Sequence, residues 1–133
     1  MINGNTFDVK TVKYGHSTKV WREIRHRYPA GGTIENVSDW VSVGEIPAGT
    51  PVKYDMKAKT LKAYTNQQIK GASDISTLGI NAYLQEDAFI TSGSTIATGT
   101  AVYAGELYDY MFDAEVLSKL QSITTTQQIV WVH

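Results

Sequence analysis

The sequence predicts a mainly β (α+β) fold: one compact domain like a β-barrel or β-sandwich, with one short C-terminal helix and an N-terminal arm. Short β-prone runs, separated by turns that contain glycine or proline, follow one another from residue 40 onward. The clearest helical spacing with a capping residue occurs near the C-terminus. The 133 residues, of which 42% are hydrophobic and 19% are charged, are sufficient for one hydrophobic core.

The first segment is predicted as a basic N-terminal arm, docking or extended, over residues 1–32, followed by a β-rich domain over residues 33–133. Residues 1–30 hold six basic and two acidic side chains (6 − 2 = +4), whereas residues 31–133 hold six basic and 11 acidic ones (6 − 11 = −5). The boundary is marked by a proline and two glycines, which favour a loop. A basic arm beside an acidic body is suited to contact an acidic surface.

Within this arm, the spacing of Val20, Trp21, Ile24 and Tyr28 predicts a short helix after an extended stretch. The basic side chains either dock on another molecule, fold back on the chain's own acidic body, or form a solvated face. On the docking hypothesis, the side chains expected to contact the partner are Lys10, Lys13, Lys19, Trp21, Arg22, Arg25 and Arg27.

Strand patterns dominate the first part of the body. A β-prone run at residues 40–43 precedes a turn with two prolines at residues 46–51. Residues 52–55 and 60–64 alternate apolar and polar side chains, which predicts a hairpin with a basic tip at residues 56–59. These elements come one after another with short connections, as is typical of a β-rich domain.

The second part of the body continues this pattern. Residues 78–85 alternate and are predicted as a strand with one apolar face. Residues 101–104 are predicted as a strand that Gly105 stops and that continues over residues 106–110 after the break. Residues 113–120 are predicted as a helix that begins at the capping residue Asp113. The chain ends in a run of apolar residues that predicts a largely buried strand: Ile129, Val130, Trp131 and Val132.

Motifs of catalysis, metal binding and phosphate binding are missing from the sequence. There is no G-x-S-x-G element, no phosphate-binding loop and no cysteine, and the three histidines are far apart in sequence. We therefore expect a protein that is not an enzyme and that needs no cofactor or metal. The adjacent carboxylates of Glu86 and Asp87 leave a small hydrolase as a remote alternative. Asp109 and Asp113 leave a calcium site as another.

Other partner classes are disfavoured by composition. A net charge of −1 argues against a nucleic-acid binder, and no apolar stretch is long enough for a membrane span. Eight tyrosines and three tryptophans can pack between strands, form a protein interface or offer a sugar-stacking platform. The tyrosines in or near strands are Tyr54, Tyr64, Tyr83, Tyr103, Tyr108 and Tyr110.

Three short motifs occur in a recognisable order. I-P-A-G-T-P-V at residues 46–52 is followed by G-I-N-A-Y-L-Q-E-D-A-F-I at 79–90 and by G-T-A-V-Y-A-G-E-L at 99–107. With the C-terminal helix and strand, this order resembles the head decoration and head fibre proteins of tailed bacteriophages, over about residues 45–132. The resemblance implies a non-catalytic, trimeric decoration domain that stabilises the capsid. It also implies the major capsid protein as partner, synthesis in the host cytoplasm, and a place on the surface of the virion.

A second resemblance leads to a different function. The I-P-A-G-T element also occurs in small barrel modules of the antifreeze and sialate-synthase type, which bind sugars. The alternative expectation is therefore a carbohydrate-binding β module that uses exposed tyrosines.

Overall fold

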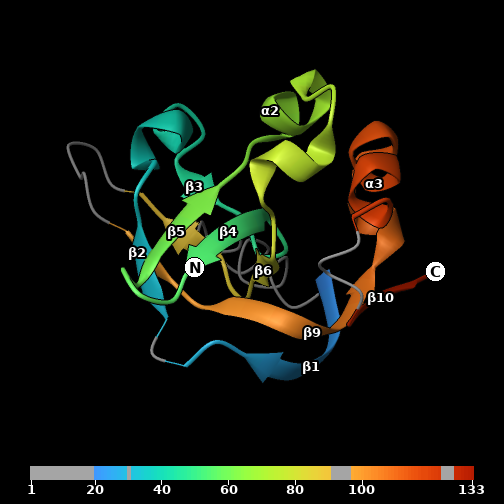
Figure 1. Ribbon diagram of the computed structural model, residues 1–133, viewed down its shortest axis with the longest axis horizontal. Helices are drawn as coiled ribbons and strands as arrows, with labels where there is room; N and C mark the ends of the chain where they lie inside the picture. Colours follow the sequence, from blue (N-terminus) through green and yellow to red (C-terminus); the bar gives the residue numbers. More distant parts are fainter. Residues whose placement is uncertain (1–19, 30, 91–96, 124–127) are drawn as a thin grey trace, which may run out of the picture.

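The computed structural model describes residues 20–29, 31–90, 97–123 and 128–133. Most of the chain belongs to one strongly curled sheet, which has the shape of half a barrel, and the helices lie together on one side of it (Figure 1). The prediction of a mainly β domain with a smaller helical part is confirmed. Lys10, Lys13 and Lys19 lie outside the described residues.

The main sheet has eight strands. They are β1 (Trp21–Arg27), β2 (Gly32–Ile34), β4 (Pro51–Asp55), β5 (Thr60–Ala63), β6 (Ala82–Leu84), β8 (Thr98–Gly99), β9 (Ala101–Tyr108) and β10 (Ile129–Val132). Their spatial order is β1-β9-β6-β4-β5-β2-β8, and β10 pairs in parallel with β9. A second, two-stranded sheet joins β3 (Glu45–Ile46) to β7 (Ala88–Phe89).

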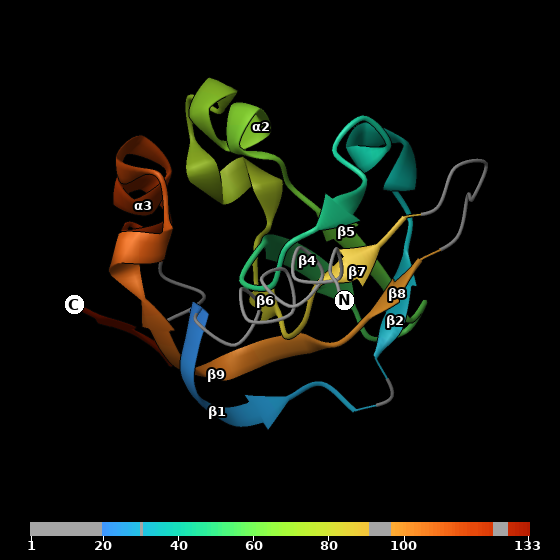
Figure 2. The same cartoon turned by 180° about the vertical axis from the view of Figure 1, so that it is seen from behind.

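The described helical elements are short. They are the α-helices α2 (Asn66–Gly71) and α3 (Ala114–Gln121) and the 3₁₀ helices η1 (Val37–Trp40), η2 (Ile75–Leu78) and η3 (Asp109–Met111). Figure 2, seen from behind, again places α2 and α3 on the side of the sheet opposite β1. Helix α3 begins at the predicted cap, because the Asp113 carboxylate accepts hydrogen bonds from the backbone N–H groups of Glu115 and Val116.

The hairpin prediction is confirmed, since β4 and β5 pair in antiparallel register around a turn. Helix α2 is absent from the predictions, although its signal is present in the sequence. Thr65 and Gln68 form a capping box: the Thr65 hydroxyl accepts from the Gln68 N–H, and the Gln68 side-chain carbonyl accepts from the Thr65 N–H. A threonine followed three residues later by glutamine is a known start signal for a helix.

The predicted short helix around residues 20–28 is wrong. Residues Trp21–Arg27 form strand β1, which pairs in antiparallel register with β9. Trp21 is buried, and its indole N–H donates a hydrogen bond of 3.1 Å to the carbonyl of Leu84. These contacts with residues more than 60 positions away outweigh the local helical spacing.

Two strand predictions need correction. Residues 40–43 lie at the end of η1 and in the following turn, since Trp40 is buried and donates its indole N–H to the carbonyl of Ala63. Over residues 78–85, only Ala82–Leu84 form a strand, because η2 extends to Leu78 and is followed by Gly79 with a left-handed φ of 70°. All three residues of β6 are buried, so the predicted polar face does not exist there.

Gly105 does not stop its strand. Strand β9 runs through this residue to Tyr108, and the missing side chain lets β1 approach closely. A Cβ at position 105 would lie 2.5 Å from the carbonyl oxygen of Glu23 and 3.2 Å from the ring of Trp21. The glycine therefore serves close packing between strands and not a break.

The C-terminal strand is present as predicted, but the prediction that it is largely buried is wrong. Only Ile129 is buried, whereas Val130 is 45% exposed and Trp131 is half-buried. Trp131 packs edge-on against Tyr83 and Phe112, with ring centroids 5.8 and 5.1 Å apart. Strand β10 pairs only with β9 among the described strands, and this edge position explains its partial exposure.

Candidate functional site

Of the basic residues predicted to contact a partner, those that the structure describes lie on the edge strand β1. Arg22, Arg25 and Arg27 are exposed and are called the basic face below. The guanidinium groups of Arg22 and Arg25 share the carboxylate of Glu106, at 3.2 and 2.7 Å. Arg27 donates a hydrogen bond of 2.8 Å to the side-chain carbonyl of Gln85. The described part of the arm thus contacts the chain's own body.

These contacts orient the arginines and contribute little to stability, because exposed ion pairs are worth only about 0–1 kcal/mol each. The three arginines have two carboxylates as partners, Glu106 and Glu23, and the latter lies 3.5 Å from Arg25. Arg27 contacts the neutral side chain of Gln85, so one positive charge is in excess (3 − 2 = +1). The basic face therefore keeps a net positive charge and free surface for a further acidic group. Charged residues along an edge strand also discourage uncontrolled strand pairing.

Trp21 does not belong to this surface. The indole is 8% exposed, and it packs inside the domain with Tyr83 and Leu107 in the same hydrophobic cluster. Its expected role as an apolar contact for a partner is therefore wrong. Regular alternation would place Arg25 and Arg27 on the same face as Trp21. The register of β1 against β9 shifts at several points between Trp21 and Arg27, and the arginines are exposed whereas Trp21 is buried.

The tyrosines pack mainly against one another and against the core. Tyr28 stacks on Tyr54 and lies against Tyr103, with ring centroids 4.7 Å apart in both pairs. Burial first, and then Tyr103 and Tyr54, raise the pKa of Tyr28. Tyr54, Tyr64 and Tyr83 are buried, so these three cannot form the expected sugar platform.

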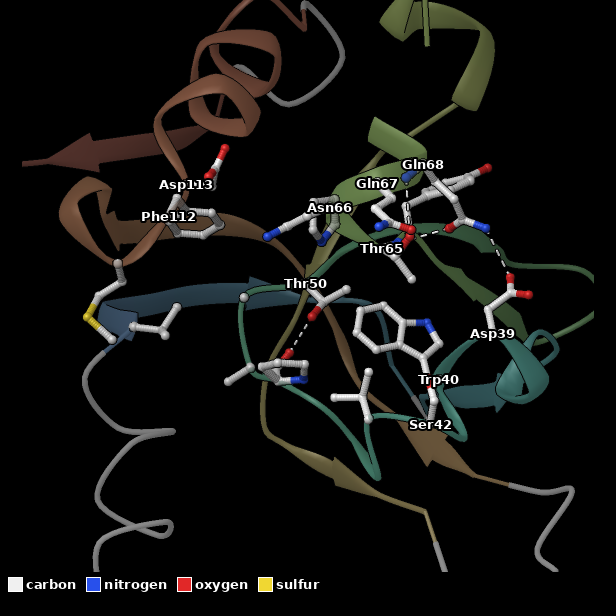
Figure 3. Close-up of a pocket in the computed structure, with 18 residues that line it drawn as sticks. Asp39, Trp40, Ser42, Thr50, Thr65, Asn66, Gln67, Gln68, Phe112 and Asp113 are labelled. Atoms are coloured by element: carbon white, nitrogen blue, oxygen red, sulfur yellow. Dashed lines mark hydrogen bonds between the residues drawn. The ribbon is translucent and has the colours of Figure 1, made fainter. Parts of the chain in front are cut away.

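A second surface feature is a groove with a volume of about 820 Å³ on the helical side of the sheet. Its walls come from η1 and the following turn, the proline-rich turn before β4, the beginning of α2, and the segment between η3 and α3. Figure 3 shows Trp40 and Phe112 on opposite sides of the groove, with Thr50 and Asn66 between them. We refer to this feature as the polar groove.

Hydrogen bonds fix one wall of the polar groove. The Gln68 amide donates to the carboxylate of Asp39 at 3.1 Å, and the Asn36 amide donates to the same oxygen at 3.0 Å. In the groove floor, the Thr50 hydroxyl donates to the carbonyl of Pro47 at 2.6 Å. The bonds to Asp39 connect η1 to α2, and the Thr50 bond closes the proline-rich turn, so these parts of the groove are formed before any ligand binds.

Two carboxylates lie at the polar groove, and both are ionised at neutral pH. Hydrogen bonds from Asn36 and then from Gln68 lower the pKa of Asp39. The backbone N–H of Val116, and then the neighbouring Lys70, lower the pKa of Asp113. A glycosidase needs one carboxyl group that is still protonated at the working pH. Neither carboxyl group of this pair has the raised pKa that such an acid requires.

The other carboxylates singled out in the sequence have structural partners. Asp87 accepts a hydrogen bond of 2.7 Å from the backbone N–H of Ala48, and Asp109 lies 3.3 Å from the ring of His133. No group of three or more potential metal ligands occurs among the described residues. In the same part of the chain, no helix is long and apolar enough to cross a membrane.

The residues of the polar groove were not found from the sequence. Thr50, Asn66 and Gln67 belong to separate segments, and only the capping box at Thr65 and Gln68 gives a local signal. Comparison of the chain with known protein families, curated proteins and solved structures found no match.

Proposed function

We propose that the protein is a non-catalytic structural protein that decorates and stabilises the capsid of a tailed bacteriophage. Its partner is the major capsid protein, its assembly is a homotrimer, and its place is the surface of the virion. The proposal rests on the order of the three motifs and on the basic face of β1. It keeps Lys10, Lys13 and Lys19 as further candidate contacts.

The motifs that carry the resemblance form one continuous unit. The Ala48 N–H of the first motif donates to Asp87 of the second. Ile46 pairs with Ala88, and Tyr83 pairs with Val102 of the third motif. Three motifs that are far apart in sequence thus support one another, which favours a shared structural role over separate catalytic ones.

The single observation that carries the docking surface is the basic face. Its arginines are exposed, are held in place by Glu106 and Gln85, and retain excess positive charge. Complementary charge of this kind mainly accelerates association and sets orientation. An acidic patch on a capsid subunit is the matching partner.

Reversing one charge on this face is expected to weaken binding to the capsid. Arg27→Glu should raise the Kd for undecorated capsids of the parent phage by about fivefold at low salt, which corresponds to about 1 kcal/mol. Lys57→Glu is the matched control, because Lys57 is also exposed but lies at the tip of the β4–β5 hairpin. Co-sedimentation with capsids measures both variants. Equal binding by the two variants and the natural protein would remove the basic face from the proposal.

The trimer is tested separately. Sedimentation velocity is expected to give a particle of three chains of 14.7 kDa each, in solution or after release from the capsid by mild denaturant. A homotrimer has closed symmetry, so its mass should not grow as the protein concentration rises. A dimer under both conditions would contradict the proposed assembly.

A further inference from the structure

We propose that the polar groove is a binding site for a neutral oligosaccharide. This inference goes beyond the capsid-binding function, and none of the basic-face residues lines the groove. Its volume of about 820 Å³ lies within the range of about 300–1,000 Å³ that is usual for ligand sites. The space is therefore large enough for a ligand of several sugar rings.

The walls combine apolar surfaces with hydrogen-bonding groups. Phe112 is half-buried and turns its ring to one side of the groove, and the edge of the buried Trp40 ring closes the other side. A pyranose ring has C–H faces that pack against aromatic carbon and hydroxyl groups at its rim that need polar partners. Ligand sites usually combine apolar and aromatic walls with a small number of polar groups.

Carboxamides supply the polar partners. The side chains of Asn66 and Gln67 are exposed at the groove and form no hydrogen bond within the described part of the chain. Each carboxamide offers two N–H donors and one carbonyl acceptor, which can bridge two neighbouring hydroxyl groups of a sugar. The Ser42 hydroxyl adds a further donor and acceptor from the opposite wall.

The negative charge of the groove favours a neutral ligand over an anionic one. Asp39 and Asp113 line it, whereas no lysine, arginine or histidine does so among the described residues. Lys70 lies outside the lining and is paired with Asp113 at 3.4 Å. Carboxylates accept hydrogen bonds from sugar hydroxyl groups and repel phosphates and acidic sugars. A neutral sugar therefore fits better than an anionic one.

Helix α2, whose first residues line the groove, is fixed at both ends. The Lys119 ammonium of α3 donates hydrogen bonds to the carbonyls of Lys70 and Ala72 at the end of α2, at 2.8 and 2.7 Å. The capping box fixes the other end of α2. A site that is already ordered loses little conformational entropy when a ligand binds.

The test uses the full chain and four probes: cellohexaose, maltohexaose, N-acetylchitohexaose and the acidic hexamer of galacturonic acid. We expect at least one neutral hexamer to bind and to shift the side-chain amide signals of Asn66 and Gln67 in ¹⁵N-resolved NMR spectra. Asn66→Ala should weaken that binding about tenfold, which corresponds to about 1.4 kcal/mol. Gln121→Ala removes an equally exposed helical carboxamide outside the groove and should leave binding unchanged.

Three results would overturn the inference. One is the absence of any shift at concentrations about tenfold above a millimolar Kd. Another is binding of a neutral hexamer that Asn66→Ala and Gln121→Ala affect equally, because the ligand would then bind elsewhere. The third is tighter binding of the acidic hexamer than of every neutral one. Capsid binding by Arg27→Glu is measured independently, so failure of one proposal leaves the other intact.

Discussion

Replacing Trp21 by alanine is expected to lower the free energy of unfolding by about 3–5 kcal/mol, as is usual for the loss of a buried aromatic side chain. Whole domains are stable by only about 5–15 kcal/mol, so the variant should be close to unfolding at room temperature. The reason is that the Trp21 indole is buried and that its N–H donates a hydrogen bond to the Leu84 carbonyl, which connects β1 to the rest of the sheet. Urea denaturation followed by circular dichroism measures the change.

Trp21→Phe separates packing from hydrogen bonding. It keeps an aromatic ring and loses only the indole donor, at a cost of about 1 kcal/mol. The Leu84 carbonyl is not left unpaired, because the Gly49 N–H also donates to it at 2.8 Å. Equal and small effects of both substitutions would mean that β1 can leave the sheet, which would support the picture of a separable docking arm.

Replacing Asn36 by leucine is expected to lower the free energy of unfolding by about 2–4 kcal/mol. The buried Asn36 side chain makes the two hydrogen bonds to Ala63 that a neighbouring strand would otherwise make. Its N–H donates to the Ala63 carbonyl at 2.6 Å, and its carbonyl accepts from the Ala63 N–H at 2.9 Å. Leucine has the same branching as asparagine, but its methyl groups are larger and it leaves the Ala63 N–H buried without a partner. Thermal and urea denaturation should both detect the loss.

Asn36→Asp provides a second measurement with a different signature. A carboxylate at position 36 would lie beside Asp39 and the Ala63 carbonyl, and these neighbours should raise its pKa in the folded state. A group with a raised folded pKa stabilises the protein below its unfolded pKa of about 4 and loses that contribution as the pH rises. The stability difference from the natural protein should therefore shrink in acid. A difference that is independent of pH would contradict the contact with Ala63.

The elements that local patterns predicted are those whose signals lie within a few residues. The β4–β5 hairpin and helix α3 depend on alternation, a short turn and the Asp113 cap, and both are present. Strand β1 was missed because its partner β9 lies about 80 residues later, and a pattern of neighbouring residues carries no information about so distant a partner. The exposure of Val130 was missed for the same reason, since only the sheet order shows that β10 is an edge strand.

The candidate sites follow the same rule. The charge of the basic face was visible in the composition, but the partners of Arg22 and Arg27 come from distant segments: Glu106 from β9 and Gln85 from the residues after β6. The polar groove was invisible because its walls come from separate segments that only the fold brings together. A carboxamide such as Asn66 carries no sequence signal for ligand binding.

The central place of β9 has a consequence for how the chain folds. Trp21 pairs with Leu107, and Val132, almost at the end of the chain, pairs with Tyr108 of the same strand. A nascent chain therefore exposes the apolar side of β1 until β9 has left the ribosome, and the parallel β10 can join only later still. Pairings of such long sequence separation form slowly. The newly made protein should pass through an aggregation-prone intermediate, in which chaperone binding competes with closure of the sheet.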